Sequence, residues 1–271
     1  MISVLVRSHN DAAYIGATID ALLMQAVGDE VEILVCDDHS VDGTAEYLDS
    51  RKKIRRIPPP AGEYRPGKTL NLLVGQARGE RVVFNNADAV PQHREYLRTL
   101  IAPLADRGVD CVFARQVARP DARAVVRKDY ERAFGDGSIS RNWDHFFSLV
   151  SSGFRRDDLR KFPFDESFRY SEDVEWVTRR RAKIVYVPEA IVEHSHNYTL
   201  RELARRFFHE GEADAQMGRV ISSLPHICGS IAAETLRDWR YLAQCGALHE
   251  FFYAPVYRAV QKISYYRGTR S

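Results

Sequence analysis

The sequence predicts an α/β fold in which helices flank a mostly parallel sheet and a helical extension follows at the C-terminus. Over the first 90 residues, short apolar runs alternate with segments of helical periodicity. This order is typical of a parallel sheet that is covered by helices on both sides. The 271 residues are 45% hydrophobic and 28% charged, which suits a globular chain of one large domain or one domain with an extension.

The regular N-terminal part begins with an apolar run at residues 2–6, which predicts a buried strand. Residues 12–26 carry apolar side chains at helical spacing, and residues 31–38 predict a second strand that ends in two carboxylates. Asp42 is the expected N-cap of the next helix, and residues 53–57 predict a short third strand.

The alternation continues after a loop at residues 58–67, which is rich in proline and glycine. Residues 69–78 predict a helix, and Gly79 is the residue expected to end it. Residues 80–91 predict a strand that runs into a polar turn.

The middle of the chain is less regular. Residues 109–120 predict a strand, and residues 146–168 predict a strand, a turn, a helix and a loop in that order. Ser171 is the expected N-cap of a further helix. Residues 182–199 predict a strand that ends near two histidines, and from Leu200 onward the pattern is mainly helical.

Charge and cysteine usage restrict the classes of partner. The formal net charge of +2 gives no overall basic field, so we expect no nucleic-acid partner. No apolar run approaches the ~18 residues of a membrane span, and the N-terminus lacks the pattern of a secretory signal. The four cysteines are scattered without a CxxC spacing, which favours reduced thiols and a cytoplasmic location.

Polar side chains gather where three of the predicted strands end. They lie at residues 7–10, 37–38 and 85–88. In an open α/β sheet, ligands bind at the carboxyl ends of the strands. Ordinary turn chemistry explains any one cluster, but three in succession favour a ligand site at this edge.

Two of these clusters contain carboxylates with a defined chemistry. Of the adjacent Asp37 and Asp38, one can cap the following turn while the other accepts hydrogen bonds from a base or a ribose. Asp88, in the turn Asn86-Ala87-Asp88, is placed to hold a divalent cation, which prefers oxygen ligands. For each, the alternative is a purely structural role in a turn.

Two further pairs lie later in the chain. His194 and His196 are two residues apart, and in an extended segment their side chains share one face, where imidazoles can join a carboxylate around a metal. Glu172 and Asp173 stand at the start of a predicted helix. There, Asp173 is either a general base for an acceptor hydroxyl or only a partner of the helix dipole.

These constellations occur in the order found in one family. The sequence resembles the family 2 glycosyltransferases of GT-A (Rossmann-like) fold over roughly residues 1–211. The segments that carry the resemblance are ISVLVRSHN, VEILVCDDHSVDGT, GKTLNLLVGQARGERVVFNNADAVP, FPFDESFRYSEDVEW and YVPEAIVEHSHNYTLRELARRFFHEG. The last two are particularly similar to the rhamnosyltransferase-like subgroup, which acts in bacterial surface polysaccharide synthesis.

The resemblance implies a role for individual residues on the donor side. Arg7 and His9 lie where such enzymes contact the nucleobase, and Asp38 matches the carboxylate that hydrogen-bonds the base. Asn86-Ala87-Asp88 matches the DxD motif, with Asn86 near the ribose. Lys68 is expected in a loop that approaches the diphosphate.

The resemblance also implies a metal site and a catalytic base. Asp88 matches the acid that meets the metal, and His194 or His196 matches the histidine that completes the metal site. Glu172 and Asp173 match the ED motif, whose Asp is the expected base. Because Asn86 and Ala87 replace acids of the fuller DxD pattern, the affinity for Mn²⁺ or Mg²⁺ is expected to be lower.

The resemblance therefore predicts a metal-dependent, inverting glycosyltransferase that uses a nucleotide-sugar donor and a saccharide or lipid-linked acceptor. Residues 1–199 form its expected catalytic domain, with a nucleotide-sugar half at about 1–90 and an acceptor half at about 91–199. Residues 200–271 form the helical extension. The alternatives are a nucleotidyltransferase and a nucleotide-sugar-binding protein without transfer activity.

The C-terminal helices mix apolar, aromatic and basic residues. Residues 200–208 show amphipathic spacing, and residues 251–270 repeat the mixture of Tyr with Lys and Arg. A helix packed on the catalytic domain is one interpretation, and peripheral contact with the inner face of the plasma membrane is the other.

Overall fold

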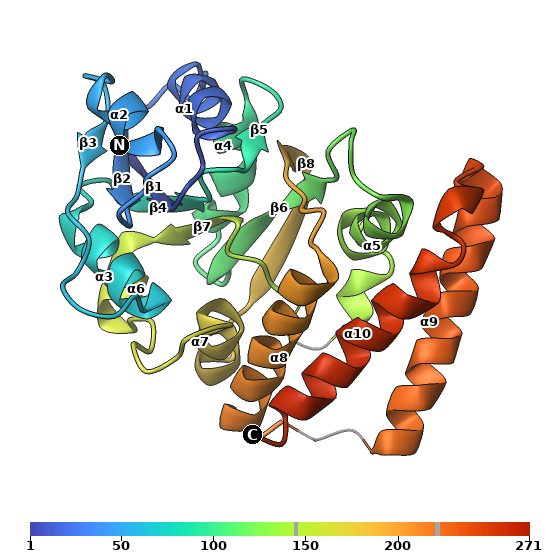
Figure 1. The fold of residues 1–271 in the computed structure, drawn as a ribbon. Coiled ribbons are helices and arrows are strands. Elements are labelled where there is room, and N and C mark those ends of the chain that lie inside the picture. The colour runs from blue at the N-terminus through green and yellow to red at the C-terminus, as the bar shows by residue number, and fades with distance from the viewer. Residues whose placement is uncertain (144–145, 220–222) are drawn as a thin grey trace. The chain divides into compact units, whose positions relative to one another are not determined.

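The computed structural model describes residues 1–143, 146–219 and 223–271, which form two compact units (Figure 1). The first unit comprises Met1–Val117, Phe134–Phe168 and Glu172–His194. The second comprises Ala118–Ala133, Arg169–Ser171 and Ser195–Ser271. The predicted boundary between a catalytic domain and an extension at residue 199 stays a prediction.

The first unit is built on a mixed sheet. Among the described residues its strands are β1 (Ile2–Ser8), β2 (Val31–Asp37), β3 (Arg55–Arg56), β4 (Arg81–Asn85), β5 (Val90–Pro91), β6 (Cys111–Val117), β7 (Ser151–Arg155) and β8 (Ile184–Glu193). They lie in the order β3-β2-β1-β4-β7-β6-β8-β5. β3, β2, β1 and β4 are parallel, as is the β6–β8 pair, whereas β7 and β5 run antiparallel to their neighbours.

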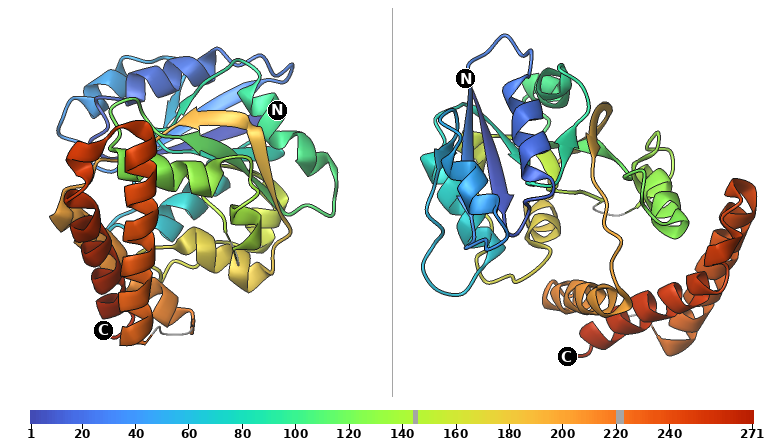
Figure 2. Two further views of the ribbon diagram at one scale, coloured as in Figure 1. Left: turned by 90° about the vertical axis from the view of Figure 1, so that its right-hand side faces the viewer. Right: turned by 45° about the horizontal axis from the view of Figure 1, so that its top comes forward.

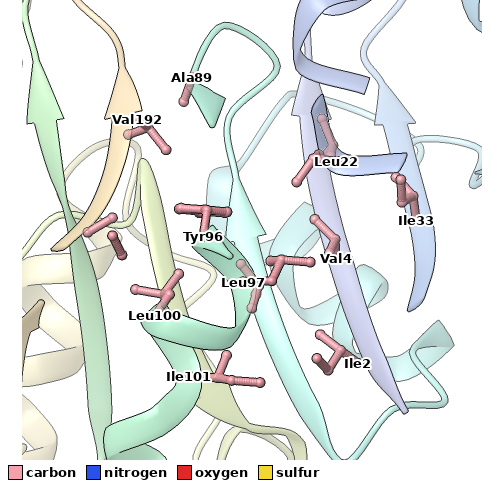
Figure 3. Close-up of a cluster of buried hydrophobic side chains, with 14 of the residues drawn as sticks. Ile2, Val4, Leu22, Ile33, Ala89, Tyr96, Leu97, Leu100, Ile101 and Val192 are labelled. Carbon is pink, nitrogen blue, oxygen red and sulfur yellow. The ribbon is translucent and has the colours of Figure 1, made fainter. Parts of the chain in front are cut away.

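Helices of the first unit cover this sheet. They are α1 (Ile15–Leu23), α2 (Thr44–Asp49), α3 (Pro66–Gln76), α4 (Tyr96–Ile101), α6 (Arg156–Lys161) and α7 (Glu172–Arg180). Figure 3 shows how side chains of α1 and α4, including Leu22 and Leu97, converge with Val4 of β1. All three are buried in one continuous apolar core, which fixes the sheet and leaves the ends of its strands for polar groups.

The structure corrects two details of the predicted helix ends. Gly43, not Asp42, holds the N-cap position of α2. Its φ of 99° lies in the left-handed region, which glycine adopts readily and which is not helical. The Asp42 carboxylate instead accepts a hydrogen bond from the N–H of Thr44 at 3.1 Å. α3 ends at Gln76, and Gly79 is needed for close packing, since a Cβ there would lie 2.6 Å from the N atom of Ser3.

The second unit is helical. It contains α8 (Leu200–Gln216), α9 (Leu224–Cys245), α10 (Tyr253–Gly268) and nearly all of α5 (Ala124–Phe134). Thr199 and Glu202 form a capping box that starts α8. α10 packs against both α8 and α9, as Figure 2 shows.

Buried ion pairs join the helices of this unit. The Arg258 guanidinium of α10 donates to Asp238 of α9 at 2.6 Å and to Asp129 of α5 at 2.8 Å. Lys128 of α5 also donates to Asp238. Because each buried charge has partners of opposite sign, the desolvation cost of the cluster is offset.

Two glycines let α8 and α10 approach closely. A Cβ at Gly211 would lie 2.2 Å from the backbone O of Tyr265, and one at Gly268 would lie 1.9 Å from the O of Phe208. Neither glycine has a positive φ, so the constraint is space and not backbone conformation.

We expect Gly211→Ala to lower the free energy of unfolding by about 1–3 kcal/mol, because α8 and α10 must move apart. Gly229→Ala is the matched control, since its added Cβ meets nothing within 4 Å, and it should be neutral or slightly stabilising. Urea unfolding followed by circular dichroism compares the two. Equal effects of both substitutions would contradict the close helix contact.

Candidate functional site

The ends of β1, β2 and β4 are joined by backbone hydrogen bonds. The N–H of Asp38 donates to the O of Ser8 at 2.8 Å, and the N–H of Ala87 donates to the O of Arg7 at 3.2 Å. The three polar clusters at these strand ends therefore lie at one edge of the sheet (Figure 1), as the sequence predicts.

The loop after β1 orients His9 and Asn10 at this edge. Asn10 has a φ of 58°, and its Oδ1 accepts a hydrogen bond from the N–H of Val41 at 2.9 Å. The exposed His9 ring bonds through Nδ1 to the backbone O of Asp38 at 2.6 Å. His9 and Asp38, two of the predicted base-binding residues, are thus next to each other.

The two acids at the end of β2 have different environments. The buried Asp37 accepts hydrogen bonds from the Ser40 hydroxyl and N–H, and Arg56 lies 3.6 Å from it. The neighbouring Asp38 is half-buried at the edge. Asp37 therefore holds the turn, and Asp38 is the acid at the edge.

The turn after β4 is fixed by the buried Asn85. Its side-chain amide donates to the backbone O of Asn86 at 3.0 Å and of Ala89 at 2.8 Å, and its Oδ1 accepts from the Tyr96 hydroxyl at 3.1 Å. The N–H of Asn86 donates to the O of Val150 at 2.8 Å. This turn places Asp88 directly after β4 in a fixed conformation.

Asp88 faces a histidine across the sheet edge. His194 Nε2 lies 3.4 Å from Asp88 Oδ2, and both side chains are buried. His194 Nδ1 lies 2.9 Å from Gln116 Oε1, and Gln116 Nε2 donates to the Ser148 hydroxyl at 2.8 Å. Because the Gln116 oxygen can only accept, Nδ1 carries the proton and the Nε2 lone pair points toward Asp88.

Asp88, His194 and His196 each offer one ligand atom, and these atoms lie within 4.8 Å of one another. The His196 ring also stacks on Tyr198, with ring centroids 5.0 Å apart. One carboxylate and two imidazoles are a donor set that suits a divalent first-row transition-metal ion, and an orienting partner on the far nitrogen of a ligand His is typical of such sites. These residues therefore fit a divalent cation.

Asp173 lies in the first turn of α7. Its carboxylate accepts hydrogen bonds from the N–H of Leu149 at 3.1 Å and of Val174 at 2.8 Å. Burial raises the pKa of Asp173 to about 6, and the negative charge of Glu172 adds to this rise. The two N–H donors and the charge of Arg7 lower it only in part.

Glu172 is engaged by Arg7. The Arg7 guanidinium donates from Nη1 to Glu172 Oε1 at 2.8 Å, and both side chains are largely buried. The structure thus brings together two residues for which the sequence predicts separate roles, nucleobase contact for Arg7 and catalysis for Glu172.

Three consecutive residues connect these parts of the site. Ser148 bonds to Gln116, the partner of His194. The N–H of Leu149 bonds to Asp173, and the O of Val150 bonds to the N–H of Asn86. We call residues 148–150 the connecting segment, because it links the histidine, the acid of α7 and the turn that carries Asp88.

Lys68 differs from its predicted setting. It lies in the first turn of α3 and not in the preceding loop, because Pro66 starts that helix earlier than the apolar spacing indicates. Its contact with a diphosphate stays a prediction.

Gln116, Asn85 and Tyr96 were not among the predicted site residues. A buried polar side chain within an apolar strand, such as Gln116 in β6, is the signal that points to such a role. The sequence does not show which distant group that side chain meets.

Comparison with known sequences gives a family. A family model described as glycosyl transferase family 2 matches residues 3–162, more than half of the chain. The O-antigen chain rhamnosyltransferase RfbN of Salmonella typhimurium is 24% identical over 226 residues, which cover 78% of this chain and 71% of that protein. The O-antigen chain rhamnosyltransferase WbaN of Salmonella anatum is 25% identical over 194 residues, 66% of this chain and 61% of that protein.

Solved structures share the fold. The mannosyltransferase PcManGT from Pyrobaculum calidifontis, in complex with GDP-Man and Mn²⁺, has a TM-score of 0.66 at 18% identity and covers 99% of this chain and 86% of that one. Glucosyl-3-phosphoglycerate synthase from Mycobacterium tuberculosis, with Mn²⁺, UDP and phosphoglyceric acid, has a TM-score of 0.58 at 20% identity, covering 82% and 80%. These likenesses confirm the predicted GT-A fold.

We expect Asp88→Ala to abolish measurable Mn²⁺ binding in calorimetric titrations, because it removes the carboxylate of the donor set. Gln116→Ala should weaken Mn²⁺ binding about tenfold, since His194 loses the partner that orients it. Asp157→Ala, which removes an exposed carboxylate on α6, is the control. If it weakens binding as much as Asp88→Ala does, the site is not the one described.

Proposed function

The chain belongs to glycosyl transferase family 2, and from this premise we propose that it moves a sugar from a nucleoside diphosphate sugar to an acceptor hydroxyl, with inversion at the anomeric carbon. The family match favours transfer over the nucleotidyltransferase and binding-only alternatives. The O-antigen chain rhamnosyltransferases among its relatives support a nucleotide-activated rhamnose as donor and a bacterial surface polysaccharide as product.

The observation that carries the proposal is the connecting segment. It ties the Asp88 turn, the Gln116–His194 pair and Asp173 to one short piece of chain. A glycosyl transfer needs two functions near each other, one that stabilises the leaving diphosphate and one that accepts the proton of the attacking hydroxyl.

On the donor side, we assign Asp88, His194 and His196 to a divalent cation, and the two imidazoles favour Mn²⁺ over Mg²⁺. When bound, such a cation acts as a Lewis acid on the diphosphate oxygens as negative charge develops there. His9 and Asp38, adjacent at the edge of the sheet, are assigned to the nucleobase.

On the acceptor side, we assign Asp173 as the general base. The base works best when its pKa lies near the working pH, and burial beside Glu172 brings the carboxylate toward that range. The hydrogen bonds from Leu149 and Val174 hold the carboxylate in place while it takes the proton from the acceptor hydroxyl.

We expect Asp173→Asn to lower kcat about 10²–10⁴-fold while donor affinity changes less than twofold, because the amide cannot accept the proton. In the wild type, kcat/KM should fall as the pH drops below about 6, since protonation removes the base. Release of nucleoside diphosphate from a panel of sugar nucleotides measures the kcat of the variant and the pH dependence of kcat/KM in the wild type. Asp20→Asn on the exposed face of α1 is the control, and wild-type turnover by Asp173→Asn would refute the assignment.

We further propose that α10 rests on the inner face of the plasma membrane, where a lipid-linked acceptor is available. Phe252, the N-cap residue of α10, is 85% exposed, and Val256 and Ile263 are exposed along the helix. Residues 251–271 contain no Asp or Glu, and Arg267 and Arg270 are exposed, so this surface combines apolar and positive groups as binding to an anionic lipid surface requires. Among the described helices, none has the length and hydropathy to cross a bilayer.

We expect the full chain to float with vesicles that contain 30% phosphatidylglycerol, and to float less as salt rises. The triple variant Phe252→Ser, Val256→Ser, Ile263→Ser should stay in the soluble fraction, because it loses the apolar contacts. Val41→Ser removes an equally exposed apolar side chain from the first unit and should float like the wild type. Flotation of the triple variant at the wild-type level would exclude this surface.

A further inference from the structure

Neither the proposed donor binding nor the proposed proton transfer uses the ion pair between Arg7 and Glu172. We propose that Arg7 is a positioning residue, which anchors the first turn of α7 to the end of β1 through Glu172 and offsets the negative charge beside Asp173. This rests on the proposed function, in which Asp173 is the base, whereas the contact of Arg7 with the nucleobase stays a prediction.

Arg7 is held at both of its ends. Its backbone O accepts the N–H of Ala87, next to Asp88, and its side chain donates to Glu172, next to Asp173. Only 20% of the Arg7 side chain and 9% of the Glu172 side chain are exposed. A side chain so placed links the turn that carries the metal ligand to the helix that carries the base.

The charges around Asp173 explain why a positively charged side chain is needed beside it. Glu172 faces it from the same helix, and Arg7 faces it from β1. Tyr64 lies within electrostatic reach of both Arg7 and Glu172, and Asp38 lies within reach of Tyr64. Without Arg7, the positive charge that lowers the pKa of Asp173 would be lost, while the charge of Glu172 that raises it would remain.

A structural role and an electrostatic role predict different outcomes. If Arg7 only packs, its loss lowers stability and leaves the titration of Asp173 unchanged. If Arg7 offsets charge, its loss makes Asp173 harder to ionise, whereas loss of the Glu172 charge makes Asp173 easier to ionise. Removing both charges together returns Asp173 to nearly its original titration.

The experiment is a ¹³C NMR titration of the free protein labelled at the aspartate carboxyl carbons, which needs no donor. The Asp173 signal is the one that Asp173→Asn removes. Relative to wild type, we expect Arg7→Gln to raise the Asp173 midpoint by about one pH unit and Glu172→Gln to lower it by about one unit, each a tenfold change in proton affinity. The double variant and Arg7→Lys should titrate within about 0.3 unit of wild type.

Midpoints that stay unchanged, or that move in the same direction in both single variants, overturn the proposal. If Arg7→Gln fails to fold, the double variant is compared with Glu172→Gln instead. Removing Arg7 from the Glu172→Gln variant must then raise the Asp173 midpoint by about one pH unit, a tenfold change in proton affinity. The proposed function fails separately, by wild-type turnover of Asp173→Asn. If Asp173→Asn is inactive but the Asp173 midpoint does not move in the Arg7 and Glu172 variants, only the proposed role of Arg7 is refuted.

Discussion

The hydrogen bonds of Ser148, Leu149 and Val150 set the separation of the groups in the candidate site. Each typically contributes about 1 kcal/mol, and the bond from the Leu149 N–H to the Asp173 carboxylate more, because its acceptor carries charge. Since all three bonds arise from one short segment, a displacement that lengthens one also strains the others. The groups that we assign to the metal and to the proton transfer are therefore linked through residues 148–150, in addition to the link that the Arg7 side chain provides.

The two carboxylates of the site owe their different roles to their neighbours. Asp88 faces the imidazole of His194, whose far nitrogen is bonded to Gln116, so the near side of the pair presents atoms suited to bind a cation. Asp173 instead lies beside another carboxylate, with Arg7 beyond it, and its pKa is raised. These different surroundings support the different roles that we propose for the two acids, a metal ligand for Asp88 and a proton acceptor for Asp173.

Much of this arrangement could be predicted from the sequence, and the rest depends on contacts between distant residues. The clusters at the ends of β1, β2 and β4 were predictable because parallel strands end at a common edge. The reversal of β7 was not, since strand direction follows from long-range pairing. The Arg7–Glu172 pair was not predictable either, because the two residues are 165 positions apart and each matches a different motif.

Ala87 shows how packing limits the composition of the turn that carries Asp88. Its side chain is 1% exposed within the apolar core of the first unit, and its N–H is bonded to the O of Arg7. A carboxylate at this position would be buried without water, at a cost of several kcal/mol unless a cation reached it. An acid at the middle position of the motif, next to Asp88, is therefore excluded by the same contacts that join β4 to β1. Core packing therefore leaves Asp88 as the acid of this turn, and the imidazoles after β8 are the further ligands that we propose beside it.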